Sequence, residues 1–244
     1  MNLEIEPGFI GIGPNHIVSG MNSYAYIYRY CAPDGTDFTE TVLERKTDYF
    51  ARILKVCLNK SYIAVLTEVN CYLQTIETDE ETFYERRYPE NENEKKIDQI
   101  YLSENFLTML DSANRIIIFC LESRKVIYEH KPDYQIQKFF PNHNATKIVF
   151  IDKEAKGVLF NCISEESIEI KEFSKKITEI IWDLFEPNLF CGLDVDTVYT
   201  FLYNRKFYKG DCCYAVPEIL SIENVDNTDE ICLTKIDKGL SPMI

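Results

Sequence analysis

The chain contains 244 residues, of which 45% are hydrophobic and 27% are charged, a composition that excludes wholesale disorder. Its formal net charge of −14 argues against binding to nucleic acid or to an anionic lipid surface, because the long-range field repels both. No apolar run approaches the roughly 20 residues that a membrane-spanning helix needs, and the first residues lack the basic and apolar regions of a signal peptide. We therefore expect a soluble chain of the cytosolic type, without direct membrane insertion.

Nine cysteines are scattered along the chain, with no Cys-x-x-Cys pair. Most lie in apolar runs typical of strands, which predicts small buried side chains and no disulfide framework. Without a route through a glycosylating compartment, Asn59-Lys60-Ser61 and Asn144-Ala145-Thr146 are chance matches to the glycosylation motif.

A run of apolar residues recurs along the chain at a nearly constant distance. The runs begin at Ile17, Ile63, Leu107, Ile148, Leu189 and Ile231, so that successive starts are 46, 44, 41, 41 and 42 residues apart. Three of the runs end alike, at Leu110-Asp111, Ile151-Asp152 and Leu193-Asp194. Because an Asp accepts hydrogen bonds from the amides of its own turn, we expect one turn structure at all three positions.

Each recurring run belongs to a unit of four predicted strands. The strands after the runs are predicted at 24–30, 72–76, 115–121, 158–163 and 198–203, outer strands at 125–128 and 167–171, and innermost strands at 51–58, 97–102, 136–140, 177–182 and 219–222. Four strands in 41 to 46 residues is the spacing of β-propeller blades. An aperiodic β-sandwich would not keep one spacing over five steps.

The repeat predicts an all-β chain, with under roughly 10% helix, folded as a β-propeller of about five to six divergent WD40-like blades with four antiparallel strands each. The sixth unit holds only two predicted strands, at 218–223 and 230–235, and residues 2–6 supply one more. Because a ring that lacks blades exposes apolar faces, we expect the chain to be part of a larger ring and, alone, to form an open arc or a strained ring.

The blade pattern predicts a set of buried positions. Val65, Met109, Phe150 and Cys191 are expected to be buried between neighbouring blades, since they lie inside strands that are covered on both faces. The Gly-His and Trp-Asp pairs of consensus repeats are absent except for Trp182-Asp183, on an innermost strand. Apolar packing, and not the usual polar network, is therefore expected to hold the blades together.

The most polar stretch runs from Glu77 to Glu94, inside the second unit, where an outer strand and its connection belong. It is interpreted as a solvated loop, with an acidic docking surface as the alternative. Substitutions of Glu92 and Glu94 are accordingly expected to leave stability unchanged.

Few residues suggest chemistry. The segment Gly11–His16 resembles the start of a dinucleotide fingerprint, but it lacks the third glycine and has a proline where phosphate-binding amides are needed. His16, His130 and His143 lie in or beside turns and strand ends, without Cys or Asp at metal-ligand spacing. The pair Cys212-Cys213 is assigned to an outer strand.

Two further patterns remain open. Forty acidic residues guarantee close carboxylate pairs, and none stands out for acid–base catalysis. The basic-aromatic segment 203–208 is either an exposed strand edge or a contact for phosphate or a partner. The sequence therefore assigns no catalytic, cofactor-binding or metal-binding residue, and it leaves the partner-binding residues unknown.

Several segments of the chain resemble one family. They are the opening Leu3-Glu4-Ile5-Glu6-Pro7-Gly8-Phe9-Ile10-Gly11-Ile12-Gly13 with Asn15–Asn22, the stretch from Lys138 through Asp152 and Gly157, the segments Glu169–Ser174 and Ile181-Trp182, and Asp194–Phe201. In this order they resemble the second β-propeller of the WD repeat-containing protein 19 family, the large WD-repeat subunit of intraflagellar transport complex A. Over 205–244 only strand spacing supports the match.

The resemblance implies a non-enzymatic scaffold in retrograde intraflagellar transport, cilium assembly and import of membrane cargo. The implied partners are the other subunits of the complex and ciliary cargo adaptors, and the implied location is the cilium, the ciliary base and the cytoplasm. Residues 1–244 would be a partial second propeller, without the family's first propeller and helical repeats. The alternatives are a propeller subunit of another coat-like or vesicle-trafficking complex, or a propeller hydrolase.

Overall fold

The computed structural model describes residues 6–31, 37–77, 83–91, 93–170, 173–195, 197–203, 212–213 and 235–237. The regular elements in these ranges are all strands, so the described part of the chain contains no helix, in agreement with the all-β prediction. The chain divides into two compact units, Met1–Pro132 and Asp133–Ile244.

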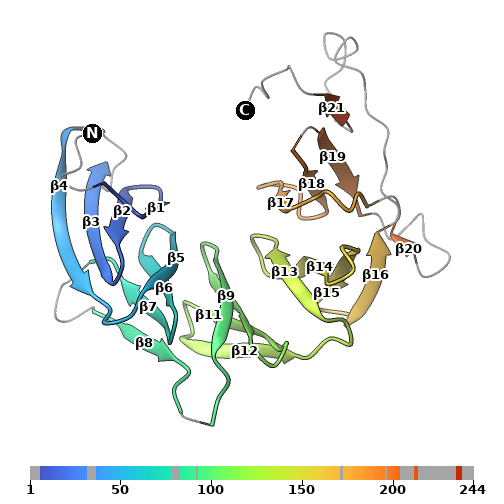
Figure 1. Cartoon of the computed structure of the whole chain (residues 1–244), viewed down its shortest axis with the longest axis horizontal. Helices are drawn as coiled ribbons and strands as arrows, with labels where there is room; N and C mark the ends of the chain where they lie inside the picture. The colour runs from blue at the N-terminus through green and yellow to red at the C-terminus, as the bar shows by residue number, and fades with distance from the viewer. Residues whose placement is uncertain are drawn as a thin grey trace. The chain divides into compact units, whose positions relative to one another are not determined.

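The first unit holds three four-stranded sheets (Figure 1). Their strands are β1 (Phe9–Ile12), β2 (His16–Met21), β3 (Tyr24–Cys31) and β4 (Asp37–Asp48), then β5 (Ile53–Leu58), β6 (Tyr62–Thr67), β7 (Cys71–Thr75) and β8 (Glu85–Tyr88), then β9 (Ile97–Leu102), β10 (Phe106–Asp111), β11 (Ile116–Cys120) and β12 (Lys125–His130). Every strand pairs antiparallel with the next, as in a propeller blade.

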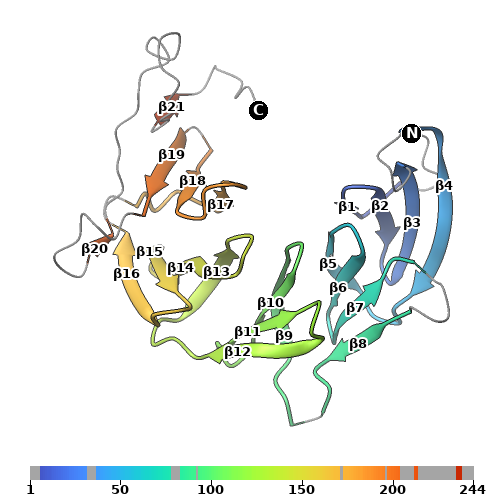
Figure 2. The same cartoon turned by 180° about the vertical axis from the view of Figure 1, so that it is seen from behind.

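The second unit holds two sheets, which Figure 2 shows from behind. The first contains β13 (Ile136–Pro141), β14 (Lys147–Asp152), β15 (Gly157–Asn161), β16 (Glu166–Ile170) and β20 (Cys212–Cys213). The second contains β17 (Glu179–Trp182), β18 (Leu189–Leu193), β19 (Thr197–Leu202) and β21 (Lys235–Asp237). Trp182 lies on the innermost strand β17, as predicted.

Two segments late in the chain add outer strands to these sheets. β20 pairs with β16 in parallel, which confirms the outer-strand assignment of Cys212-Cys213. β21 pairs antiparallel with β19. The prediction that Lys235 ends a strand of a sixth unit is therefore wrong, because this residue starts the outer strand of the fifth sheet. The rest of the predicted sixth unit, residues 2–5, Glu92 and most of the segment 203–208 lie outside the described residues.

The second strand of the second sheet, β6, is buried on both faces because alternate side chains enter different clusters. In β6, Ile63 and Val65 pack with the first sheet, whereas Ala64 and Leu66 pack with the third. This arrangement accounts for the solidly apolar runs in the sequence, since period-two alternation places every side chain in one core or the other.

Three of the four predicted core positions are fully buried. Val65 lies in the cluster between the first and second sheets, and Met109 lies in the cluster between the second and third. Phe150 is also inaccessible to solvent, with its ring centroid 5.6 Å from that of Tyr134.

The prediction for Cys191 is wrong, because this side chain is only half-buried. The ladder pairs Phe150 with Phe139 and Gly192 with Ile180, and Asp152 and Asp194 end the two runs, so that Gly192 is the equivalent of Phe150. Counting from the first residue of each run shifts the register by one, since the runs differ in length. One residue of shift moves a side chain to the opposite face of a strand.

Phe150→Ala is expected to lower the free energy of unfolding by about 3–5 kcal/mol, because truncation leaves a cavity in a fully packed core. Phe185→Ala is the matched control in the same unit, since its ring is exposed. Urea denaturation of both variants tests this prediction; equal midpoints would contradict the assigned burial.

Gly192→Ala is expected to cost about 1–3 kcal/mol of stability. A Cβ atom there would lie 2.8 Å from Cδ1 of Ile177 and 3.2 Å from Cε2 of Phe201. Cys191→Ala should cost less, because that side chain is half-buried. Thermal melts of both variants test this order. If Cys191→Ala lowered the melting temperature more than Gly192→Ala, the register expected from the sequence would be correct instead.

Candidate interaction surface

Two of the three predicted turn aspartates, Asp111 and Asp152, form equivalent turns. Asp111 Oδ1 accepts hydrogen bonds from the amides of Ala113 and Arg115, at 2.9 and 2.8 Å. Asp152 Oδ1 accepts from the amides of Glu154 and Lys156, at 2.8 and 2.9 Å. The turn at Asp194 is one residue shorter, and its Oδ1 accepts from the amide of Thr197 at 2.9 Å. An Asp that accepts from amides of its own turn is thus confirmed at all three positions, whereas the prediction of one turn structure is wrong for Asp194.

Two asparagines link a sheet to the next one along the chain within each unit. Asn59 Oδ1 accepts from the amides of its own turn, and Nδ2 donates to the carbonyl oxygen of Ser103 in the following sheet at 2.8 Å. Asn142 repeats this pattern, with Nδ2 donating to the carbonyl oxygen of Pro187 at 3.3 Å. Because Asn59 is buried in this role, its side chain is closed to a glycan.

Trp182 makes a third link, since Nε1 donates to the carbonyl oxygen of Phe140 on β13 at 2.8 Å. The expectation that apolar packing alone holds the sheets together is therefore incomplete. Sequence reasoning missed both asparagines because it searched for the pairs of consensus repeats. The available signal was an Asn directly after an innermost strand in two units.

The three histidines belong to three different sheets. His16 begins β2, His130 ends β12 with its ring stacked on Tyr128, and His143 lies in the turn after β13. No group of three or more His, Cys, Asp or Glu residues able to hold a metal ion occurs in the described part of the chain. Within the same ranges, no helix is long and apolar enough to cross a membrane.

His16 is buried beside a carboxylate. Its Nε2 atom lies 3.0 Å from Oε2 of Glu44, which also pairs with Arg29, and Nδ1 is buried without a hydrogen-bond partner. Burial lowers the pKa of His16, and the negative charge of Glu44 opposes this shift. A protonated ring would leave a buried Nδ1–H without an acceptor, so the neutral form is favoured.

Free thiols are present at five of the described cysteines, namely Cys57, Cys71, Cys120, Cys162 and Cys191. Cys71 is fully buried, as expected for a small apolar side chain, and burial raises its pKa. Burial also raises the pKa of Cys162 to about 12, which disfavours the thiolate needed for nucleophilic chemistry.

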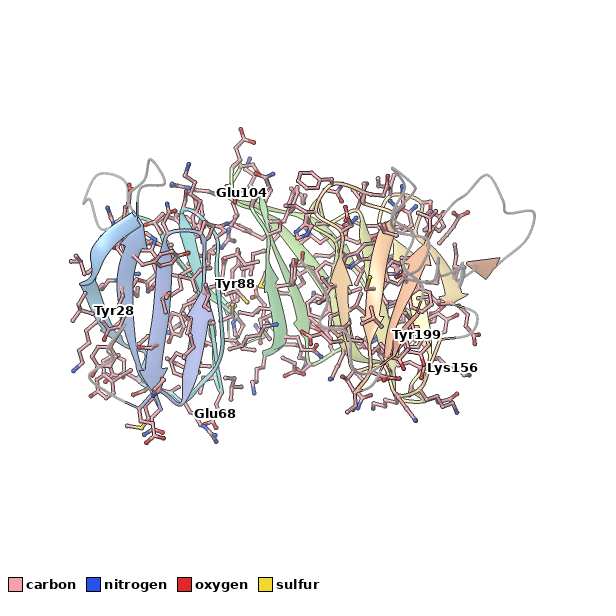
Figure 3. All side chains as sticks on the ribbon, turned by 90° about the horizontal axis from the view of Figure 1, so that it is seen from above. Tyr28, Glu68, Tyr88, Glu104, Lys156 and Tyr199 are labelled. Atoms are coloured by element: carbon pink, nitrogen blue, oxygen red, sulfur yellow. The ribbon has the colours of Figure 1, made fainter. Side chains whose placement is uncertain are left out.

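The turns of each sheet lie at the two opposite ends of its strands. Figure 3 shows the two ends in the first unit, marked by Glu104 in the turn between β9 and β10 and Glu68 in the turn between β6 and β7. Large apolar side chains are exposed in turns of both units. Phe50, between β4 and β5, is 90% exposed, and Phe185, between β17 and β18, is 89% exposed.

Phe185 and its neighbour Leu184 form the apolar tip of the turn 183–188. Leu184 is 65% exposed. Asp183 Oδ1 accepts from the amides of Phe185 and Glu186, at 2.9 and 2.7 Å, which fixes the turn. The corresponding turns of the other sheets carry Pro14-Asn15, Lys60-Ser61, Glu104-Asn105 and His143-Asn144 in their tips. The sequence signal for this surface is thus an apolar pair where other units have polar residues.

The sequence and the fold resemble known proteins. The family model described as WDR19 second beta-propeller matches residues 1–224. WD repeat-containing protein 19 of Homo sapiens is 25% identical over 218 residues, which cover 86% of this chain and 16% of that protein. WD repeat-containing protein dyf-2 of Caenorhabditis elegans is 22% identical over 231 residues, which cover 86% of this chain and 17% of that protein.

Among solved structures, Hsv2 of Kluyvelomyces marxianus has a TM-score of 0.52 at 12% identity, over 79% of this chain and 61% of that chain. This likeness concerns the fold alone. Together with the blade-like sheets, the family match confirms the predicted β-propeller fold. The chain spans about a sixth of the length of the curated relatives, as the 16% coverage shows.

Asn142→Asp is expected to destabilise the chain by about 1–3 kcal/mol. The new carboxylate keeps the acceptor for the turn amides, but it cannot donate to Pro187 and instead faces that carbonyl oxygen. Asn144→Asp, in the same turn and exposed, is the matched control. Equal unfolding free energies would contradict a structural role for the link.

The low pKa of His16 predicts a loss of stability in mild acid. Because the pKa is lower in the folded chain than the ordinary value of 6.5, the full stability is present above pH 6.5 and falls as the pH decreases toward the folded-state value. His16→Gln should remove this part of the pH dependence. Denaturation of both chains at pH 7.5 and 5.5 measures the difference, and parallel losses would refute the prediction.

Proposed function

Because the chain belongs to the WDR19 second beta-propeller family, we propose that it is a non-enzymatic interaction scaffold of intraflagellar transport complex A. In this role it supports retrograde transport, cilium assembly and the import of ciliary membrane cargo. Its partners are other subunits of the complex and cargo adaptors, and it acts in the cilium, at the ciliary base and in the cytoplasm.

The observation that carries this proposal is the family match over residues 1–224, nearly the whole chain. The relatives at 25% and 22% identity align over 86% of the chain, so the likeness extends beyond single repeats. Propellers of this kind present turns and rims to protein partners, and the exposed apolar turns agree with such use.

We further propose that residues 1–244 are a partial second propeller of a longer protein. The chain corresponds to 16% of the length of the human relative, which has room for additional domains. In this proposal, blades encoded elsewhere complete the ring, and a first propeller and helical repeats complete the scaffold.

Co-purification with the purified complex A subunits of the same organism tests the scaffold role. We expect the tagged chain to retain at least one subunit and to reach the cilium when expressed in ciliated cells. An unrelated propeller of similar net charge is the control, because it presents the same architecture without the family surface. Retention of no subunit, or retention equal to that of the control, would contradict the proposal.

A further inference from the structure

The apolar tip of Leu184 and Phe185 is exposed and yet rigidly held. Two backbone hydrogen bonds hold the turn in addition to those of the Asp183 carboxylate. The amide of Leu189 donates to the carbonyl oxygen of Glu186 at 3.1 Å, and the amide of Asp183 donates to the carbonyl oxygen of Leu189 at 3.0 Å. Asn142 of the neighbouring sheet secures the far side of the turn through Pro187. An aromatic side chain on such a turn loses little conformational entropy when a partner covers it.

A second exposed apolar side chain belongs to the same end of this unit. Ile163, in the turn between β15 and β16, is 78% exposed. The adjacent amide of Cys162 donates to the carbonyl oxygen of Thr146 at 2.9 Å, and Thr146 lies in the turn that Asn142 anchors. Hydrogen bonds therefore connect the three turns that carry Ile163, Asn142 and Phe185.

The charges of these turns are predominantly negative. Asp183 and Glu186 flank the apolar tip, and Glu165 and Glu166 follow Ile163. The positive charge of Lys147 interacts with the carboxylate of Glu186. A second copy of this chain would bring the same acids and another net charge of −14 to the contact. Electrostatic repulsion therefore argues against self-association and favours a basic partner.

We propose that Leu184 and Phe185 anchor a protein–protein interface whose partner offers an apolar pocket bordered by Lys and Arg side chains. This inference rests on the proposed function, since it takes the partner to be a subunit of intraflagellar transport complex A. The aromatic ring fills the pocket, and the surrounding carboxylates steer the basic surface toward it.

Binding of purified complex A subunits to the chain, measured by surface plasmon resonance, tests the anchor. The double variant Leu184→Ser, Phe185→Ser is expected to raise Kd by roughly tenfold or more, because central aromatic anchors dominate interface energy. Phe50→Ser is the matched control, as Phe50 is equally exposed on the other unit. Its Kd should equal that of the parent chain, and unchanged circular dichroism and melting exclude unfolding as the cause.

Charge is tested separately with Glu186→Gln, which keeps the acceptor that Oε1 offers to Asn188. This variant should slow association and weaken the dependence of binding on salt, with little change in the dissociation rate.

The outcomes separate the two proposals. If the parent chain binds no subunit, both the scaffold role and the anchor are overturned. If the parent binds and the double variant binds equally well, or Phe50→Ser loses as much affinity, the anchor alone is overturned. A dimer of the parent that the double variant abolishes would identify a second copy as the occupant, against the proposed basic partner.

Discussion

The structure depends on one constraint, namely that the second strand of each central sheet must be covered on both faces. β6 satisfies it by sending Ile63 and Val65 to one neighbouring sheet and Ala64 and Leu66 to the other. Each large apolar side chain buried in this way contributes about 1.5–3 kcal/mol, so the strand is stable only with sheets on both sides.

Features that follow from the alternation of side chains between the two faces of a strand could be predicted from the sequence. The strand at 97–102 matches β9 residue for residue, and the burial of Val65, Met109 and Phe150 follows from their place inside largely apolar runs. Counting from the first residue of each run misplaced the register of β18, although the Asp that ends the runs in the sequence marks Gly192 as the equivalent of Phe150. A glycine gives no hydropathy signal, and the missing volume is filled from elsewhere, by Ile177 and Phe201.

The polar links and the exposed surface were harder to predict for a different reason. Asn59 and Asn142 act through carbonyl groups of another sheet, and a backbone carbonyl has no signature in the sequence. Leu184 and Phe185 follow β17 closely, so that their hydrophobicity resembles that of the strand itself. Only the three-dimensional turn, with its amides bound to Asp183, shows that these side chains face solvent.

The direction of the asparagine links has a consequence for the order of synthesis. Asn59 lies in the second sheet, and the carbonyl groups that its amide contacts lie 44 and 45 residues further along the chain. When only the first two sheets have left the ribosome, the side-chain amide of Asn59 therefore lacks its acceptor, and one apolar face of the second sheet is uncovered. Emergence of the third sheet supplies the carbonyl acceptors for Asn59 and covers the apolar face of the second sheet. Asn142 in the fourth sheet depends in the same way on the fifth, so that in each unit the edge of the nascent chain that awaits a partner is the C-terminal one.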